Sequence, residues 1–444
     1  MARRGCPRSR PDRPRKAAAT VVLALLAGTA GCDRVSPRAL FAPAPGPTPI
    51  EVGLLHSQTG TMAISETSVR DAEELALLEI DAAGGLLGRP VEAVVEDGRS
   101  RSTDIFPRRA RKLLEQDRVV AIFGGWTSDS RKAMQPIVAA ARSLLFYTVQ
   151  YEGAECAPGV IYTGATPNQQ ILPALDWFLG EAGGRRRRVF LVGSDYVYPR
   201  TANHVARTYL ATKGIEVVGE AYVPLGQQDF AAAVAELLAA SPDLVLSTVN
   251  GDSNVGFYAE LAKQRVTAAA IPVVATSIGE NELRSLQPAH VAGHFVAANY
   301  FQSIATEANR GFVQTVRSEF GLDRVTDDPM ESAYVAVKLW RLGVERAGST
   351  DADAVLAALS KGAEIQGPGG TVRFDPKTRR LAKRFRLGRA RLDRQFDVVH
   401  ESPGPIEPDP YPAFAFPGWR CDWTQGPPVE GPPIDLGTGR EAGR

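Results

Sequence analysis

Aromatic, hydroxyl and amide side chains recur where short apolar segments of the sequence end. These candidate ligand-binding residues are Trp126, Ser128, Tyr147, Gln150, Tyr151, Tyr196, Tyr198, Asn250 and Asp252. Hydroxyl and amide groups donate and accept hydrogen bonds, and aromatic rings form flat apolar walls. Together these residue types predict a pocket for a small, planar, neutral and polar molecule. A structural role competes at each position, since Ser128 also suits a helix N-cap and a tyrosine at a strand end often only packs.

The sequence lacks the usual motifs for cofactors, metals and catalysis. Neither G-x-G-x-x-G nor G-x-x-x-x-G-K-[ST] occurs at a strand–helix turn, and neither G-x-S-x-G nor H-E-x-x-H occurs. His290 and His294 are four residues apart, but Pro288 and Gly293 argue against a helical metal pair. We therefore expect no cofactor, no metal and no enzymatic activity. An amide-hydrolysing enzyme is the competing class, and release of ammonia would reveal it.

The candidate residues follow elements that alternate regularly between strand and helix. A first series has apolar strands at 50–56, 91–95, 119–123 and 144–147, with helical patterns at 69–83, 104–116 and 130–142. A second series has strands at 189–194, 215–223, 244–248 and 272–275, with helices at 200–213, 229–240 and 254–263. This alternation is typical of parallel sheets covered by helices on both faces. It predicts an α/β protein of two lobes facing a cleft, with the ligand beyond the carboxyl ends of the strands.

Composition and charge exclude several other classes. The 444 residues are 44% hydrophobic and 23% charged, which excludes a fibrous or wholly disordered chain. The formal net charge is +1, but residues 1–31 hold seven basic residues and one acid, so the remainder is mildly acidic at −5. No nucleic-acid partner is expected. We interpret Arg185–Arg188 as a solvated turn and 379–394 as the exposed faces of a β-hairpin, with a lipid or transporter contact as the alternative for the latter.

The amino-terminal region predicts export. Residues 1–31 combine a basic stretch with a short apolar run, as in a bacterial signal peptide. Thr29–Cys32 resembles a lipobox, which predicts lipidation of Cys32 and a membrane-anchored periplasmic or cell-surface protein; ordinary cleavage nearby is the alternative. Residues 32–49 are a Pro/Ala-rich tether, and we predict no transmembrane helix. Whether Cys156 and Cys421 pair is left open by the sequence.

Segments spread over most of the chain resemble one known family. They include HSQTGTMAISET (56–67), VVEDG (94–98), FGGWTSDSRKA (123–133), LLFY (144–147), VQYEG (149–153), YTGATPNQQ (162–170), GSDYVYPRTAN (193–203), NGDSNV (250–255), NYFQSI (299–304), RVTDDPMESAY (324–334) and PIEPDPYPA (405–413). The sequence resembles the substrate-binding proteins of urea ABC transporters. These belong to the type I periplasmic binding proteins, beside the branched-chain amino-acid binders and an amide-sensing regulator. VQYEG and NGDSNV resemble the urea branch, whereas Thr148 stands where that family usually has proline, which bears on selectivity.

The resemblance implies roles for the pocket residues. The hydroxyl of Ser128 and the start of its helix would donate to the urea oxygen. The hydroxyls of Tyr147 and Tyr196, with carbonyls near Val149, would accept urea N–H groups.

The other pocket residues would enclose the ligand. Trp126, Tyr151 and Tyr198 would wall its plane, with Gln150 and either Asn250 or Asp252 as further polar partners. A short-chain amide has fewer N–H donors and would leave acceptors unpaired.

The resemblance also implies two lobes joined by three crossovers. Lobe 1 is expected at 50–167 plus 299–367, lobe 2 at 168–298 plus 368–415, and 416–444 is a Pro/Gly-rich tail that is mostly disordered, with Trp419 and Trp423 as candidates for docking. The function implied is capture of urea for an ABC transporter permease. The alternatives are binding of short-chain amides or branched-chain amino acids, and a sensory module for a membrane receptor.

Overall fold

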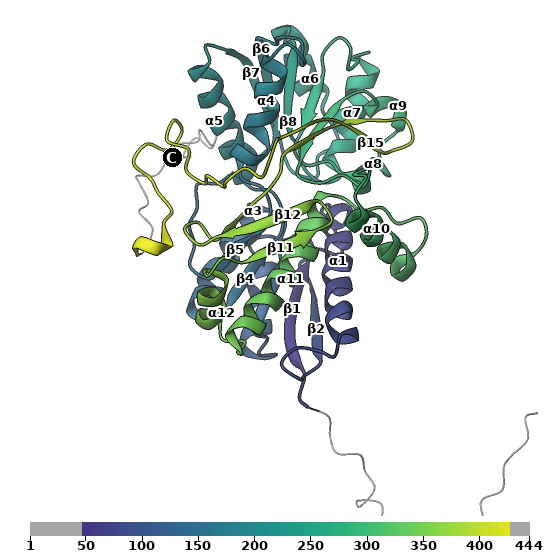
Figure 1. The fold of residues 1–444 in the computed structure, drawn as a ribbon. Helices are drawn as coiled ribbons and strands as arrows, with labels where there is room; N and C mark the ends of the chain where they lie inside the picture. The colour runs from purple at the N-terminus through teal and green to yellow at the C-terminus, as the bar shows by residue number, and fades with distance from the viewer. Residues whose placement is uncertain (1–46, 427–444) are drawn as a thin grey trace, which may run out of the picture. The chain divides into compact units, whose positions relative to one another are not determined.

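The computed structural model of the chain describes residues 47–426. The predicted signal peptide, Cys32, most of the tether and the end of the tail lie outside the described residues. Two sheets built mainly of parallel strands form the framework, and helices lie along both (Figure 1). The predicted α/β class with two lobes is confirmed. Between residues 47 and 426, no helix has the length and apolar character needed to cross a bilayer.

The first sheet has eight strands in the order β11-β12-β13-β5-β4-β3-β1-β2. In chain order these are β1 (Ile50–His56), β2 (Val91–Asp97), β3 (Ala121–Gly124), β4 (Leu144–Tyr147), β5 (Val160–Tyr162), β11 (Glu364–Gly367), β12 (Gly370–Asp375) and β13 (Arg380–Ala382). The associated helices are α1 (Ala63–Ala82), α2 (Ile105–Glu115), α3 (Ser128–Ala140), α10 (Glu307–Phe320), α11 (Asp328–Ala347) and α12 (Ala352–Leu359). Strands β1 to β5 pair in parallel, and α1 packs on α11 (Figure 1).

The second sheet has seven strands in the order β15-β14-β10-β9-β8-β6-β7. In chain order these are β6 (Arg188–Ser194), β7 (Glu216–Val223), β8 (Leu244–Thr248), β9 (Val273–Ala275), β10 (Phe295–Ala298), β14 (Arg386–Ala390) and β15 (Phe396–Glu401). The associated helices are α4 (Ile171–Leu179), α5 (Val197–Thr212), α6 (Ala231–Ala240), α7 (Ser253–Lys263), α8 (Glu280–Leu283) and α9 (Pro288–Val291).

Local sequence explains how the central strands end. Strands such as β3, β4 and β8 are largely apolar and fully buried, as expected for parallel strands covered on both faces. Gly124 ends β3 with a φ of 145°, and a Cβ there would lie 2.0 Å from the carbonyl oxygen of Leu55. Only glycine therefore lets the chain turn toward Trp126 beside β1. Thr127 then caps α3, because its hydroxyl accepts from the N–H of Ser130.

Two expectations for the carboxyl-terminal third need correction. The predicted step between lobes at 367/368 falls inside the β11–β12 hairpin, which continues the first sheet through β13, so the chain changes sheet between Ala382 and Arg386. The stretch 379–394 is not an exposed hairpin, because β13 and β14 belong to different sheets. Arg380, Lys383 and Arg386 are all buried. Period-two alternation gives the side of a strand, but it does not say which side is solvated.

The carboxyl-terminal segment up to residue 426 is pinned to the body. Cys421 and Cys156 form a disulfide, with their Cα atoms 5.6 Å apart. The guanidinium of Arg379 lies 3.8 Å from the ring centre of Trp423, and Trp419 packs against Tyr411. The docking of both tryptophans is therefore confirmed, and the expected disorder does not begin at residue 416.

Candidate functional site

The candidate residues gather where the two sheets face each other. Trp126 and Ser128 follow β3, and Tyr147 ends β4 before the loop holding Val149 to Tyr151. The two sheets, each with its helices, form the two halves of the molecule. In the half built on the second sheet, Tyr196 and Tyr198 follow β6, and Asn250 and Asp252 follow β8. Parallel strands present their carboxyl ends at one edge, and this places the loops from both sheets together.

Side-chain hydrogen bonds join the two halves. The indole N–H of Trp126 donates to Asn250 Oδ1 at 3.3 Å. Gln150 Nε2 donates to the hydroxyl of Ser277, after β9, at 2.9 Å.

Three further bonds join the same halves. Ser65 donates to Glu282 at 2.6 Å, Asn281 donates to Asp327 at 2.7 Å, and the hydroxyl of Thr61 donates to Asp252. The structure is therefore in a closed arrangement.

A small cavity remains between the halves. Its volume is about 10 Å³, close to the space of one water molecule. Its lining comprises Trp126, Gln150, Gln170, Thr276, Ser277, Ile278, Gly279, Glu282, Ala297, Ala298, Asp328 and Pro329. Trp126 supplies an apolar wall, and the polar lining is dominated by hydroxyl, amide and carboxylate groups. None of the described residues that line it is a cation.

Ser128 and Glu152 belong to a buried ion network beside this cavity. Arg131, completely buried, donates to Glu152 at 2.9 Å and to Glu155 at 2.8 Å. Ser128 accepts from Arg131 at 3.0 Å and donates to Glu152 at 2.5 Å. Its proton is thus engaged within the protein rather than directed at a ligand oxygen in this closed arrangement. Although burial opposes ionisation, Arg131 and Lys132 hold the pKa of Glu155 far below its ordinary value.

Buried tyrosine rings pack against the guanidinium of Arg131. Its guanidinium lies 4.6 Å from the ring centre of Tyr147 and 4.9 Å from that of Tyr151. The hydroxyl of Tyr147 donates to the carbonyl of Trp126, and that of Tyr151 accepts from Arg380. Burial raises the pKa of Tyr151 to about 12 and that of Tyr147 further, so both phenols are neutral. Tyr147 thereby holds the backbone of Trp126 in place, and the hydroxyl of Tyr151 is occupied by its hydrogen bond from Arg380.

The tyrosines of the second half face these groups. The Tyr198 hydroxyl shares a hydrogen bond of 2.8 Å with Thr276, a cavity residue, and burial raises its pKa to about 12. Tyr196 is half-buried, and burial together with the nearby Tyr147 raises its pKa well above the ordinary value. Tyr198 thus holds Thr276, a residue of the cavity wall, in place.

Two carboxylates of the lining carry raised pKa values. Burial, offset in part by Lys383, raises the pKa of Asp328 to about 6. Burial also raises the pKa of Glu282, although Ser65 and the backbone N–H of Gly279 donate to it. A buried carboxylate has lost hydrogen bonds to water, and the N–H groups of a donor-rich ligand replace them, so such a ligand stabilises its charged form.

The structure thus divides the predicted site. Trp126 and Gln150 line the cavity, and Tyr147, Tyr198 and Asn250 contact lining residues. Ser128 and Tyr151 belong to the ion network, Asp252 bridges to Thr61, and Val149 is buried beside Gln150.

Sequence reasoning pointed to the strand ends that hold Glu152 and Ser277 but assigned no role to either, and it missed Arg131, Glu282 and Asp328. Arg131 lies one helical turn after Ser128, Glu152 lies within VQYEG, and Asp328 lies within RVTDDPMESAY. These motifs drew attention to the three segments, but nothing in the sequence showed which partners the three charged side chains have.

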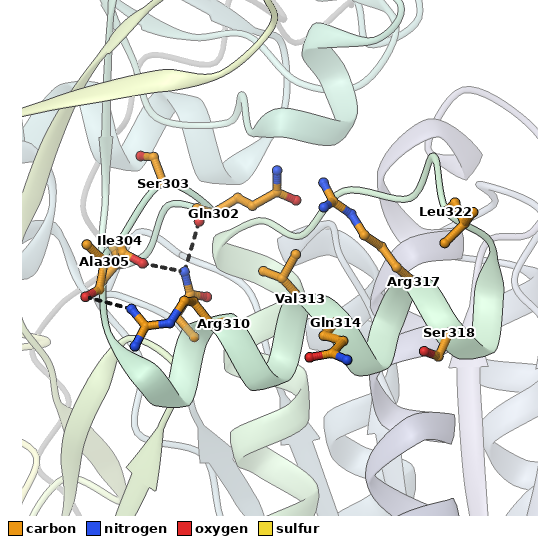
Figure 2. Close-up of a pocket in the computed structure, with 11 residues that line it drawn as sticks. Gln302, Ser303, Ile304, Ala305, Arg310, Val313, Gln314, Arg317, Ser318 and Leu322 are labelled. Carbon is orange, nitrogen blue, oxygen red and sulfur yellow. Dashed lines mark hydrogen bonds between the residues drawn. The ribbon is translucent and has the colours of Figure 1, made fainter.

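Larger openings lie away from this site. A groove of about 600 Å³ runs along α10. Figure 2 shows Val313, Arg317 and Leu322 among the residues that line it. Its lining comes from one stretch, 302–322, so closure of the two halves cannot enclose a ligand there. A second groove of about 920 Å³ lies between Pro136 and the two docked tryptophans. Residues 47–426 hold no cluster of three or more His, Cys, Asp or Glu arranged for a metal.

Comparison with known proteins gives a family match. A family described as a periplasmic binding protein domain matches residues 50–416. The Leu/Ile/Val-binding protein BraC3 of Rhizobium johnstonii is 26% identical over 351 residues, covering 73% of this chain and 87% of that protein. A limonene hydroxylase of Geobacillus stearothermophilus is 31% identical over 121 residues, and this chain spans only 22% of its length.

Solved structures share the fold. A Rhodopseudomonas palustris solute-binding protein of an ABC transporter, in complex with 4-hydroxybenzoate, superposes with a TM-score of 0.73 at 19% identity. The match covers 81% of this chain and 98% of that one. At this identity the likeness concerns the fold alone.

Proposed function

We propose that urea is the ligand of this chain, which belongs to the periplasmic binding protein family and is a substrate-binding protein of the ABC-transporter type. The family implies export to the periplasm and a permease partner. The proposal adds that Cys32 anchors the chain to the membrane and that urea is delivered to the permease. Because the full-length relatives are solute-binding proteins, the chain acts by binding rather than by catalysis.

The observation that carries the proposal is the cavity between the halves. At about 10 Å³ it is minute, and a ligand of four heavy atoms requires less reopening than a benzoate or a leucine. Urea presents four N–H donors on a flat frame, and the lining presents acceptors beside the indole of Trp126. A carboxylate ligand would instead meet Asp328 and Glu282 with no cation in the described lining.

Roles follow from the contacts of each residue. Trp126 walls the ligand plane, and Gln150 with Ser277 closes over it from the two halves. Asp328 accepts N–H groups, while the hydroxyl of Ser277, which accepts from Gln150, donates to the urea oxygen. The proposal keeps the predicted roles of Ser128, Tyr147, Val149 and Tyr196, and it requires the ion network around Arg131 to rearrange when urea enters the closed cleft.

Calorimetric titration of the exported chain with urea, acetamide, formamide, leucine and 4-hydroxybenzoate tests the ligand. One-to-one urea binding, weakened in Ser128→Ala and Tyr147→Phe, supports both the ligand and the predicted residues. Binding of acetamide or leucine without urea refutes urea and points to the loop at Thr148. Transport and sensing differ in the partner, so urea uptake by cells lacking the gene for the chain separates those two roles.

A further inference from the structure

Among the described residues, two carboxylates and no cation line the cavity, which is more negative charge than a neutral ligand such as urea offsets. Asp328 lines it and uses Oδ1 to accept from the backbone N–H of Asn299 at 3.1 Å. Glu282 lines it too, and its two oxygens accept from Ser65 and Gly279. Ser277 supplies a hydroxyl donor, whereas the hydroxyl of Thr276 donates to the carbonyl of Ser247 at 3.4 Å. A ligand with only donors therefore suits this lining at least as well as one that carries a carbonyl oxygen.

Further buried acids stand behind these two carboxylates. Asp327 precedes Asp328 at the start of α11 and accepts from Asn281 across the halves. Glu280, on the same short helix as Glu282, has one carboxylate oxygen that is buried without a hydrogen-bond partner among the described residues. An unpaired buried acceptor of this kind marks a shortage of donors and of positive charge in the region.

The nearby cations are already paired. Lys383 lies 3.3 Å from Glu331 and also donates to the hydroxyl of Ser332. Arg386 pairs with Glu401 at 2.6 Å and donates to backbone carbonyls. The buried carboxylates thus outnumber these cations, and a cation in the cavity would offset the excess negative charge.

We propose that the cavity binds guanidinium-type cations, the planar analogues of urea in which a third amino group replaces the carbonyl oxygen. The inference rests on the proposed function, since it assigns the same cavity. Guanidinium has the same number of heavy atoms as urea, six N–H donors and no acceptor. Its two parallel N–H groups pair with a carboxylate in a fork, and Asp328 is the carboxylate placed to receive them.

The test compares the two ligands on the full chain. Guanidinium chloride and urea are titrated calorimetrically at mildly alkaline pH, at concentrations far below denaturing ones and with ionic strength matched by sodium chloride. Because charge-assisted bonds are about twice as strong as neutral ones, guanidinium should bind about tenfold more tightly than urea and displace it.

Asp328→Asn removes the negative charge of the side chain and keeps an oxygen that can accept from the backbone N–H of Asn299. This variant should weaken both ligands, and guanidinium about tenfold more than urea, because guanidinium loses a charge-assisted pair whereas urea loses a bond from a neutral donor. Asp353→Asn is the matched control, since Asp353 is exposed and pairs with Arg142 outside the cleft. Circular dichroism checks the fold, and the comparison of ligands on the unaltered chain needs no variant.

Each outcome separates the two proposals. Urea binding without guanidinium binding overturns this inference and keeps the proposed function. Guanidinium binding that Asp328→Asn does not weaken overturns the assignment to Asp328. If neither ligand binds while leucine or a benzoate does, the proposed function and the inference both fail.

Discussion

Replacing Arg131 with methionine tests the buried ion network beside the cleft. Arg131 has no exposed surface and forms ion pairs with Glu152 and Glu155 at 2.9 and 2.8 Å. Methionine leaves Glu152 without a cation among the described residues, while Glu155 keeps Lys132. Removing one partner of a buried pair costs about 3–5 kcal/mol, because the other charge stays buried and unpaired.

Thermal unfolding followed by circular dichroism measures this loss. For a folded body of roughly 380 residues, at about 2.1 cal/mol/K per residue, it lowers Tm by about 4–6 °C. Arg142→Met is the control, since Arg142 is 81% exposed in its pair with Asp353. An Arg131→Met variant that melts as close to the unaltered chain as the control does would refute the reasoning.

The pH dependence of the same difference gives a second check. Burial raises the pKa of Glu155, but Arg131 and Lys132 together hold it far below its ordinary value of 4.5 in the folded chain. A carboxyl with a lowered folded pKa stabilises the fold above its unfolded pKa and loses this contribution as the pH falls toward the folded value. The Tm difference between the two proteins should therefore be constant near neutral pH and shrink below about pH 4.5.

Three further predictions concern stability and binding. Burial disfavours the charged imidazole of His56, but neighbouring carboxylates raise its pKa to about 9. The Tm should therefore fall as the pH rises from 6.5 to about 9, and His56→Asn should flatten that fall. Serine at both Cys156 and Cys421 opens a cross-link spanning 265 residues, worth at most about 5–6 kcal/mol in chain entropy; an unchanged Tm would contradict this. Gln150→Ala removes a bond to Ser277 across the cleft and should weaken urea binding about tenfold in calorimetry with little change in Tm.

Strand positions and the approximate site were predictable because local signals carry them. Apolar runs that end in glycine or a capping residue locate β1, β3, β4, β6 and β8, and parallel pairing then brings their ends together. The partner of each polar group was not predictable in this way. Arg131 is one helical turn from Ser128, but only the fold brings Glu152 and Glu155 to it. The burial of Lys383 likewise depends on the chain passing between sheets, which no local pattern reports.

The bonds that close the cleft explain how so small a ligand can control the two halves. They join hydroxyl, amide and carboxylate groups such as Gln150 with Ser277 and Ser65 with Glu282, and each contributes only about 0.5–1.5 kcal/mol because water can replace either partner. Opening the cleft therefore costs less free energy than separating an apolar interface of similar size. A ligand that donates to acceptors from both halves adds bonds that exist only in the closed state, and it shifts the population by the free energy of those bonds. Closure is thus sensitive to the number of donors on the ligand, and this is why urea, acetamide and guanidinium distinguish the proposals made for this cavity.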